Sequence, residues 1–283
     1  MATLKKKNKP SGDNIEDFLT PEEIGPVYKS SIEVNEDGET DKFTMPAGYI
    51  DEDGTLHQTF TLREMTGRDE EAISKADIRQ NGSKLVSTLL ARCVTSIGTL
   101  TRKEVGGDKW KEIIKSLYVG DQDFMLIKLR ELSMGSEITV THTCPHCKES
   151  MKTFVDISEL EVNPFKGQRE IPFELPKGHK DRKGEVHRTG VLHLPRGVDR
   201  EILTPLAKKN IAQASTLMLT RLCKFDDGLI ITEDIIRDLT VRDREYLQKL
   251  LQENLFGIKL EIEVTCANCG EDFIGNFNPS NFI

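Results

Sequence analysis

Four cysteines stand in two Cys-x-x-Cys pairs, Cys144 with Cys147 and Cys266 with Cys269. Two such pairs supply the four thiolates of a tetrahedral zinc site, because the turn inside each pair directs both sulfurs towards one point. Four-cysteine sites usually keep their pairs within about 15–20 residues, whereas more than a hundred residues separate these two. A tetrathiolate leaves no open coordination position, so we expect a structural Zn²⁺, with Fe as the other metal that fits these ligands. The site could close within one chain or between two chains.

A redox role is the alternative chemistry for these cysteines. Cys144-Pro145-His146-Cys147 resembles the dithiol of thioredoxin-like oxidoreductases, in which a helix N-terminus lowers the pKa of the first cysteine. Here, alternating sequence typical of a strand leads into each pair. The second pair, Cys-Ala-Asn-Cys, would also be an unusual redox centre. The pattern therefore favours a metal site.

The elements that must position the cysteines occur twice in the chain. Residues 43–71 share 11 identities with the 29 residues that lie 130 positions later, where chance gives roughly two. One eight-residue gap, near Thr101–Lys109, changes the offset to 122, and Cys144 and Cys147 then align with Cys266 and Cys269. We predict a tandem duplication, with a first repeat at 42–159, a connector at 160–171 and a second repeat at 172–283.

Each copy predicts the same α+β unit. A β-hairpin opens it, with strands at 43–50 and 56–63 joined by a turn that ends in Asp53-Gly54. Helices follow, among them an amphipathic one at 110–117 and one that runs from Asp121 to Gly135, with its counterpart from Asp243 to Gly257. A second hairpin carries each Cys-x-x-Cys at its tip. The shared four-cysteine zinc site would then join the two repeats, which explains the long separation of the pairs.

The two remaining cysteines, Cys93 and Cys223, fall on apolar helices, and we expect both to be buried hydrophobic residues. His57 and His187 occupy the same place in the two copies, and we expect surface strand positions for both. His142 and His146 could replace a cysteine ligand, but the second copy has no histidine at either place, so we expect them to face solvent.

Acidic residues open one helix in each copy, Asp69 with Glu71 and Asp199 with Glu201. They resemble acid/base pairs, but acidic residues at a helix N-terminus are explained by the helix dipole alone. Lys208 and Lys209 form an isolated pair that we assign to a solvated helix face. The sequence has no phosphate-binding loop, nucleophile elbow or metalloprotease helix, and we expect no catalytic residue and no small-molecule substrate.

The composition limits the possible partners. The net charge of −8 argues against general binding to nucleic acid, which needs a basic surface. The sequence has no apolar run of about 20 residues and no apolar signal core, so we expect no membrane association. We also expect the protein to be made and kept in the cytoplasm, where cysteines bind metals more often than they form disulfides. Residues 1–41 are predicted to form a flexible acidic arm, either a solvated tail or a segment that orders on a partner subunit.

Two stretches resemble a known family. Met45–His57, running into Thr61–Glu71, is similar to the opening of small tail-assembly proteins of contractile-tailed bacteriophages. The later helix–strand–Cys-x-x-Cys block resembles the baseplate hub proteins of T-even-type phages. The resemblance implies a structural or assembly component of a phage tail baseplate, or of a related injection machine, with other baseplate or tail subunits as partners. It also implies assembly in the host cytoplasm and a place in the virion tail. The alternative from the cysteines is a zinc-ribbon protein that binds nucleic acid or a transcription component, against which the acidity counts.

Overall fold

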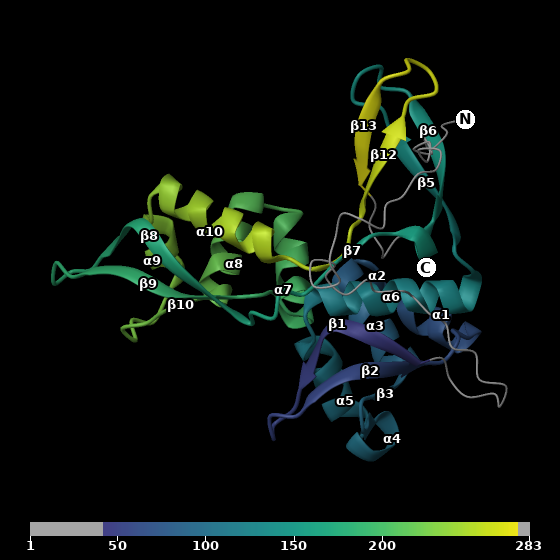
Figure 1. The fold of residues 1–283 in the computed structure, drawn as a ribbon, viewed down its shortest axis with the longest axis horizontal. Helices are drawn as coiled ribbons and strands as arrows, with labels where there is room; N and C mark the ends of the chain where they lie inside the picture. Colours follow the sequence, from purple (N-terminus) through teal and green to yellow (C-terminus); the bar gives the residue numbers. More distant parts are fainter. Residues whose placement is uncertain (1–41, 277–283) are drawn as a thin grey trace, which may run out of the picture.

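The structure is a computed structural model that describes residues 42–276, so the expected arm at 1–41 lies outside the described residues. Helices and antiparallel strands are mixed along the chain, which confirms the predicted α+β class (Figure 1). Within residues 42–276, no helix is long and apolar enough to cross a membrane.

The elements of the N-terminal half are β1 (Lys42–Ile50), β2 (Leu56–Leu62), α1 (Gly67–Ile73), α2 (Ala76–Arg79), α3 (Gly82–Cys93), β3 (Val94–Ile97), β4 (Leu100–Thr101), α4 (Arg102–Val105), α5 (Gly107–Ser116), α6 (Val119–Met134), β5 (Glu137–Thr143) and β6 (Ser150–Asp156). The elements that follow are η1 (Ile157–Glu159), β7 (Val162–Asn163), β8 (Glu170–Lys180), β9 (Val186–His193), α7 (Gly197–Ala207), α8 (Ile211–Leu222), β10 (Cys223–Phe225), α9 (Glu233–Asp238), α10 (Val241–Asn254), β11 (Gly257–Ile258), β12 (Glu261–Thr265) and β13 (Asp272–Asn276).

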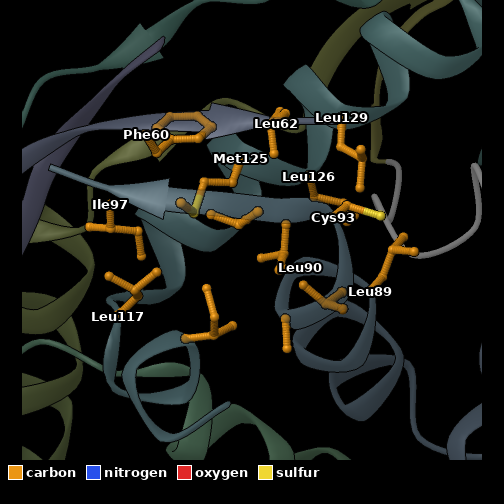
Figure 2. Close-up of a cluster of buried hydrophobic side chains, with 14 of the residues drawn as sticks. Phe60, Leu62, Leu89, Leu90, Cys93, Ile97, Leu117, Met125, Leu126 and Leu129 are labelled. Atoms are coloured by element: carbon orange, nitrogen blue, oxygen red, sulfur yellow. The ribbon is translucent and has the colours of Figure 1, made fainter. Parts of the chain in front are cut away.

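The first sheet has the strand order β1-β2-β3-β4. Its opening hairpin turns where predicted, because the Asp51 carboxylate accepts the backbone amides of Asp53 and Thr55, and Gly54 takes the positive φ that the turn needs. Apolar side chains from β2, α3 and α6 fill one core, in which Phe60, Leu89 and Met125 are fully buried (Figure 2).

The second sheet has the strand order β10-β9-β8, and the same half of the chain contains the helices α7 to α10. It begins with a hairpin whose turn repeats the first one: Asp181 accepts the backbone amides of Lys183 and Glu185, and Gly184 has a positive φ. A separate core packs β8, β9 and β10 against α8, α9 and α10. Tyr118 and Ala47 of the first half also belong to this core, so the two halves are packed together.

Two further hairpins, β5–β6 and β12–β13, lie side by side, although α7, α8 and α10 intervene in the sequence (Figure 1). Near their base, Ile138, Val140 and Val155 of the first hairpin form a small core with Leu260 and Ile262. Closer to the tips, a second small core contains Met151 and Val264 together with Cys144 and Cys266. The short pair β7–β11 joins the stretch after β6 to the stretch after α10.

Polar contacts also connect the halves. The Asn81 side chain donates to the Glu201 carbonyl oxygen at 2.9 Å, and the hydroxyls of Ser83 and Thr204 share a hydrogen bond. On α7, Arg200 pairs with Asp123 of α6 and donates to the Gln122 side chain. The N-terminus of α7 is therefore fixed against the helices of the first half.

Candidate metal centre

The first cysteine pair lies between β5 and β6. The alternation of buried and exposed residues along both strands directs Ile138, Val140 and Met151 to one face, and the ladder continues up to the pair Thr143–Ser150. Beyond it, the Cys144 amide donates to the Glu149 carbonyl oxygen at 2.9 Å, and the Lys148 amide donates to the Cys144 carbonyl oxygen at 3.0 Å. These bonds close the tip and place both sulfurs on its inner side.

The second cysteine pair repeats this tip. The ladder of β12 and β13 ends at the pair Thr265–Asp272. The Cys266 amide donates to the Glu271 carbonyl oxygen at 2.9 Å, and the Gly270 amide donates to the Cys266 carbonyl oxygen at 2.9 Å. Both Cys-x-x-Cys pairs therefore sit at the tip of a hairpin, as predicted.

The structure brings the four sulfurs together. Cys144 Sγ lies 3.7 Å from Cys269 Sγ, and Cys147 Sγ lies 3.6 Å from Cys266 Sγ. All four sulfurs lie within 4.8 Å of one another. A disulfide needs about 2.05 Å between its sulfurs, so these are four thiols in one cluster. Sulfurs at about 2.3 Å from a tetrahedral ion stand about 3.8 Å apart, so the cluster is compatible with a metal site.

Burial and hydrogen bonding differ among the four sulfurs. Cys144 and Cys266 are buried, Cys147 is half-buried and Cys269 is exposed. The Asn268 side chain donates to Cys147, as does the Glu149 amide, and these bonds lower the pKa of Cys147 to about 6. The Glu271 amide donates to Cys269, but desolvation and the three neighbouring sulfurs raise the pKa of Cys269 to about 12. Four adjacent thiolates repel one another, and a bound cation would remove this repulsion.

The surroundings of Cys144 differ from those of a thioredoxin-type cysteine. A strand, β5, leads into the pair, and a second strand follows it, so no helix N-terminus is present to stabilise a thiolate at Cys144. Each cysteine also has a sulfur partner on the other hairpin. The four sulfurs therefore form one cluster that is compatible with a metal site.

One of the two histidines near the first pair lies elsewhere than predicted. His146 is exposed at the tip, as expected. His142 is buried, and the prediction that it faces solvent is wrong: it follows Ile138 and Val140 on the inward face of β5. Phe273 packs edge-on against its ring, and Gly275 of β13 approaches it so closely that a Cβ would lie 2.7 Å from its Cε1. His142 therefore packs between the hairpins and supplies no ligand to the cluster.

The prediction that His57 and His187 are surface residues is also wrong. The alternation through Phe60 and Leu62 assigns His57 to the solvent side of β2, yet it is buried, as is His187 of β9. Gly98 packs against the His57 ring, and the Asp51 carboxylate is bonded to its Nε2. These neighbours lie outside β2, so the alternation along the strand does not predict the burial of His57.

The acidic residues at the helix N-termini are structural. Asp69 is fully buried at the start of α1, where Arg63 and Arg92 donate to its carboxylate and hold its pKa well below the usual range. Asp199, at the start of α7, is paired with Arg221. Each of these aspartates also accepts the backbone amide at the N-cap of its helix. Both aspartates thus lie at a helix N-terminus, as predicted, whereas their ion pairs with arginines were not predicted.

Cys93 and Cys223 are buried, as predicted, and burial raises the pKa of the Cys93 thiol to about 11 and that of Cys223 to about 12. Cys93 is the last residue of α3, as predicted for a helical cysteine. Cys223 is the first residue of β10 and does not lie in the predicted helix. Lys208 and Lys209 are exposed just after α7 ends.

Two further aspartates, which the sequence predicts only as the first residues of two helices, are buried and have a structural role. Asp121 of α6 accepts the backbone amides of Ala47 and Gly48, and Asp243 of α10 accepts that of Lys177. Both aspartates are fully buried, and each connects a helix to the opening hairpin of its half. Asp121 and Asp243 align with each other in the sequence at an offset of 122, and this is the signal that could have identified them.

One comparison with known proteins identifies the chain. A family model described as T4 bacteriophage base plate protein matches residues 27–188, more than half of the chain. The chain belongs to this family. The resemblance that the sequence predicted is thereby confirmed. No curated protein and no solved structure matches the chain.

The match covers only part of the candidate metal centre of this base plate protein. Residues 27–188 contain Cys144 and Cys147, together with the whole of β5 and β6. Cys266 and Cys269 lie beyond the matched residues. The four-cysteine cluster of this base plate protein therefore comes from its geometry and not from the family match.

Proposed function

We propose that the protein is a structural or assembly component of a contractile phage tail baseplate, or of a related injection machine. The family match supports a structural role in a phage base plate, with other tail components as partners. We further propose that the chain is assembled in the host cytoplasm, ends in the virion tail and carries out no catalytic step.

The observation that carries the finer proposal is the arrangement of the four sulfurs. We propose that Cys144, Cys147, Cys266 and Cys269 bind one structural Zn²⁺ within a single chain. The sulfur–sulfur distances of 3.6 and 3.7 Å are close to the roughly 3.8 Å of a tetrahedral zinc tetrathiolate. Four protein ligands leave no open position, which favours a structural ion. Iron remains the alternative metal, because a tetrathiolate fixes geometry more strictly than metal identity.

We further propose that the chain is a tandem duplication and that the metal holds its two copies together, with repeats at 42–159 and 172–283. The close sulfur pairs support this, because exchanging Cys144 with Cys266 and Cys147 with Cys269 turns one pair into the other. That is the relation expected of a pseudo-twofold axis through the ion. The small cores beneath the tips also mix residues of both hairpins, so the ion would add a clamp where the copies already meet.

Metal analysis of the purified full-length protein tests the clamp. We expect the four cysteines to hold one zinc per chain in the wild type and in a Cys93→Ala control, and the zinc content to fall by one equivalent in Cys147→Ser and in Cys266→Ser. Chelation should lower the melting temperature of the wild type and of the control, because a metal bound only by the folded state stabilises it. Less than one metal per chain, together with an unchanged melting temperature on chelation, would refute the clamp. An iron site would be revealed by its visible absorption.

The place in the baseplate needs a separate test. Mass spectrometry of mature particles and of assembly intermediates should detect the chain in at least one of them. Imaging of particles with a tagged chain should then locate it in the tail. Absence from both kinds of sample would refute the structural or assembly role, whatever the metal content.

A further inference from the structure

A second group of possible metal ligands lies at the turn of the β8–β9 hairpin, on a different hairpin from the four cysteines (Figure 1). It consists of Asp181, Glu185 and His187, and one ligand atom from each lies within 4.8 Å of the others. Glu185 is exposed, Asp181 is half-buried, and His187 has only 8% of its surface exposed. An acidic turn is ordinary on a protein surface, so the histidine decides how this group is interpreted.

The two ring nitrogens of His187 have different surroundings. Nδ1 lies 2.5 Å from Oδ2 of Asp227, in the loop after β10. Nε2 is buried and has no hydrogen-bond partner, and the nearest carboxylate oxygen, Asp181 Oδ2, is 3.8 Å away. If Nδ1–H donates to Asp227, the neutral ring directs the lone pair of Nε2 towards Asp181 and Glu185. A histidine held by a carboxylate on one nitrogen, with the other nitrogen bare, is the usual arrangement of a metal-binding histidine.

Asp181 is also prepared for a ligand. Its Oδ1 accepts the backbone amides of Lys183 and Glu185, both at 2.8 Å. These bonds hold the carboxylate in place and leave Oδ2 on the side of His187. Glu185, being exposed, can change its rotamer to approach an ion at the cost of little packing.

The corresponding hairpin β1–β2 provides an internal comparison. There, His57 Nε2 is bonded directly to Asp51 Oδ2 at 2.8 Å, so the pair is closed and needs no ion. Thr55 stands where the second hairpin has Glu185, and Ile97 stands where it has Asp227. Two carboxylates around His187, those of Glu185 and Asp227, thus have no counterpart at the aligned positions around His57, and His187 is not bonded to the turn aspartate.

We propose that Asp181, Glu185 and His187 bind a divalent transition-metal ion, with Zn²⁺ as the preferred ion, and that Asp227 orients His187. Imidazole and carboxylate ligands at about 2.1 Å suit Zn²⁺, and ligand atoms around a tetrahedral ion stand about 3.4 Å apart, so the group must contract slightly on binding. The ion closes the β8–β9 turn, and the hydrogen bond between His187 and Asp227 joins this hairpin to the loop after β10. Three protein ligands leave one position for water.

Zinc uptake by the full-length protein tests this site. We expect the wild type to bind one zinc equivalent more than His187→Gln in calorimetric titrations. We expect Glu185→Thr, which introduces the residue of the first hairpin, to weaken this equivalent at least about tenfold. His57→Gln, the matched variant of the first hairpin, should bind as much zinc as the wild type. The difference between wild type and variant is the readout, so the occupancy of the cysteines does not affect it.

Two outcomes would overturn the proposal. One is equal zinc uptake by the wild type, His187→Gln and Glu185→Thr, which would place any additional zinc elsewhere. The other is a wild type that binds no zinc beyond the cysteine site, which would leave a proton as the only occupant of His187 Nε2. Since Glu185 is exposed, Glu185→Thr keeps the test valid if the histidine variant fails to fold, and circular dichroism checks both variants.

Discussion

The Asp121 carboxylate accepts a hydrogen bond from the backbone amide of Ala47 at 2.9 Å, although 74 positions separate the two residues. It also accepts the amide of Gly48 at 3.2 Å. Both amides belong to the part of β1 where the ladder with β2 is interrupted, between Thr44 and Tyr49. The aspartate thus provides buried backbone groups with the partner that the sheet does not supply.

This relationship predicts an unusual pH dependence. Burial raises the pKa of Asp121 to about 7, despite the two amides that favour its carboxylate. A carboxyl group whose folded-state pKa lies above its unfolded value of about 3.9 binds its proton more tightly in the folded state, so its contribution lowers stability as the pH rises from about 4 to about 7. Asp121→Asn cannot ionise. We expect the stability of this variant relative to the wild type to increase on the order of 3 kcal/mol between pH 4 and pH 8.

Urea unfolding of both proteins at pH 4, 6 and 8 measures the effect. The asparagine keeps one acceptor oxygen and brings an amide donor close to Gly48, which adds an offset that does not depend on pH. Therefore only the pH dependence of the difference in unfolding free energy between Asp121→Asn and the wild type is informative. Parallel stability curves of the two proteins would contradict a raised pKa.

Two glycines that align with each other in the sequence at an offset of 130 should respond differently to alanine. Gly67 begins α1, and a Cβ there meets open space. Gly197 begins α7, and a Cβ there would lie 2.0 Å from Nε2 of Gln122, which is fully buried and donates to the Ile114 carbonyl oxygen. We expect Gly197→Ala to cost about 1–3 kcal/mol of stability, because the amide must move in a packed interior. Gly67→Ala should be neutral or stabilise by up to about 1 kcal/mol.

Chemical denaturation of the two variants and the wild type measures these changes in stability. A similar loss in both would mean that the effect comes from the helix start itself. A loss confined to Gly197→Ala would locate it at the contact of α7 with α6, where the two halves meet.

The sequence predicted the local features of the fold and the residues of the candidate metal centre. The alternation before Cys144 and Cys266 placed each pair after a strand, and the Asp-x-x-Gly turns placed the opening hairpins. Side-chain burial was predicted less well. His57 packs against Gly98, and His142 packs against Phe273 of the other hairpin. Both contacts depend on residues distant in the chain, which alternation within one strand cannot detect.

The buried aspartate of α1 should tolerate substitution far less well than its neighbour. Asp69 is fully buried and bonded to Arg63, Arg92 and the Thr66 amide, whereas Glu71 is exposed. Asp69→Ala leaves two guanidinium groups without their carboxylate, and we expect a loss of about 3 kcal/mol. Glu71→Ala should change stability by less than about 0.5 kcal/mol. Thermal unfolding of the two variants measures the contrast, and an Asp69→Ala protein as stable as Glu71→Ala would show that the buried ion pairs contribute nothing.

The two cysteine tips differ at the residue after the second cysteine, and this difference predicts opposite effects of exchanging the residues. Lys148 has a φ of 63°, and it is the one residue other than glycine with a positive φ between residues 42 and 276. Gly270 has a φ of 76° at the same place of the second tip, with open space around it. A side chain in this conformation costs about 1 kcal/mol. We expect Lys148→Gly to stabilise the protein by about 0.5–1 kcal/mol and Gly270→Lys to destabilise it by about 1 kcal/mol, both with unchanged metal content.

Urea unfolding in the presence of zinc, together with metal analysis, tests both changes. The hydrogen bond from Lys148 Nζ to the Pro145 carbonyl oxygen is exposed, so its loss should offset little of the gain. Lys148→Met removes this bond while keeping a side chain at the strained position, and it should be no more stable than the wild type. If Lys148→Gly proved less stable than Lys148→Met, the left-handed conformation of the first tip would not be a source of strain.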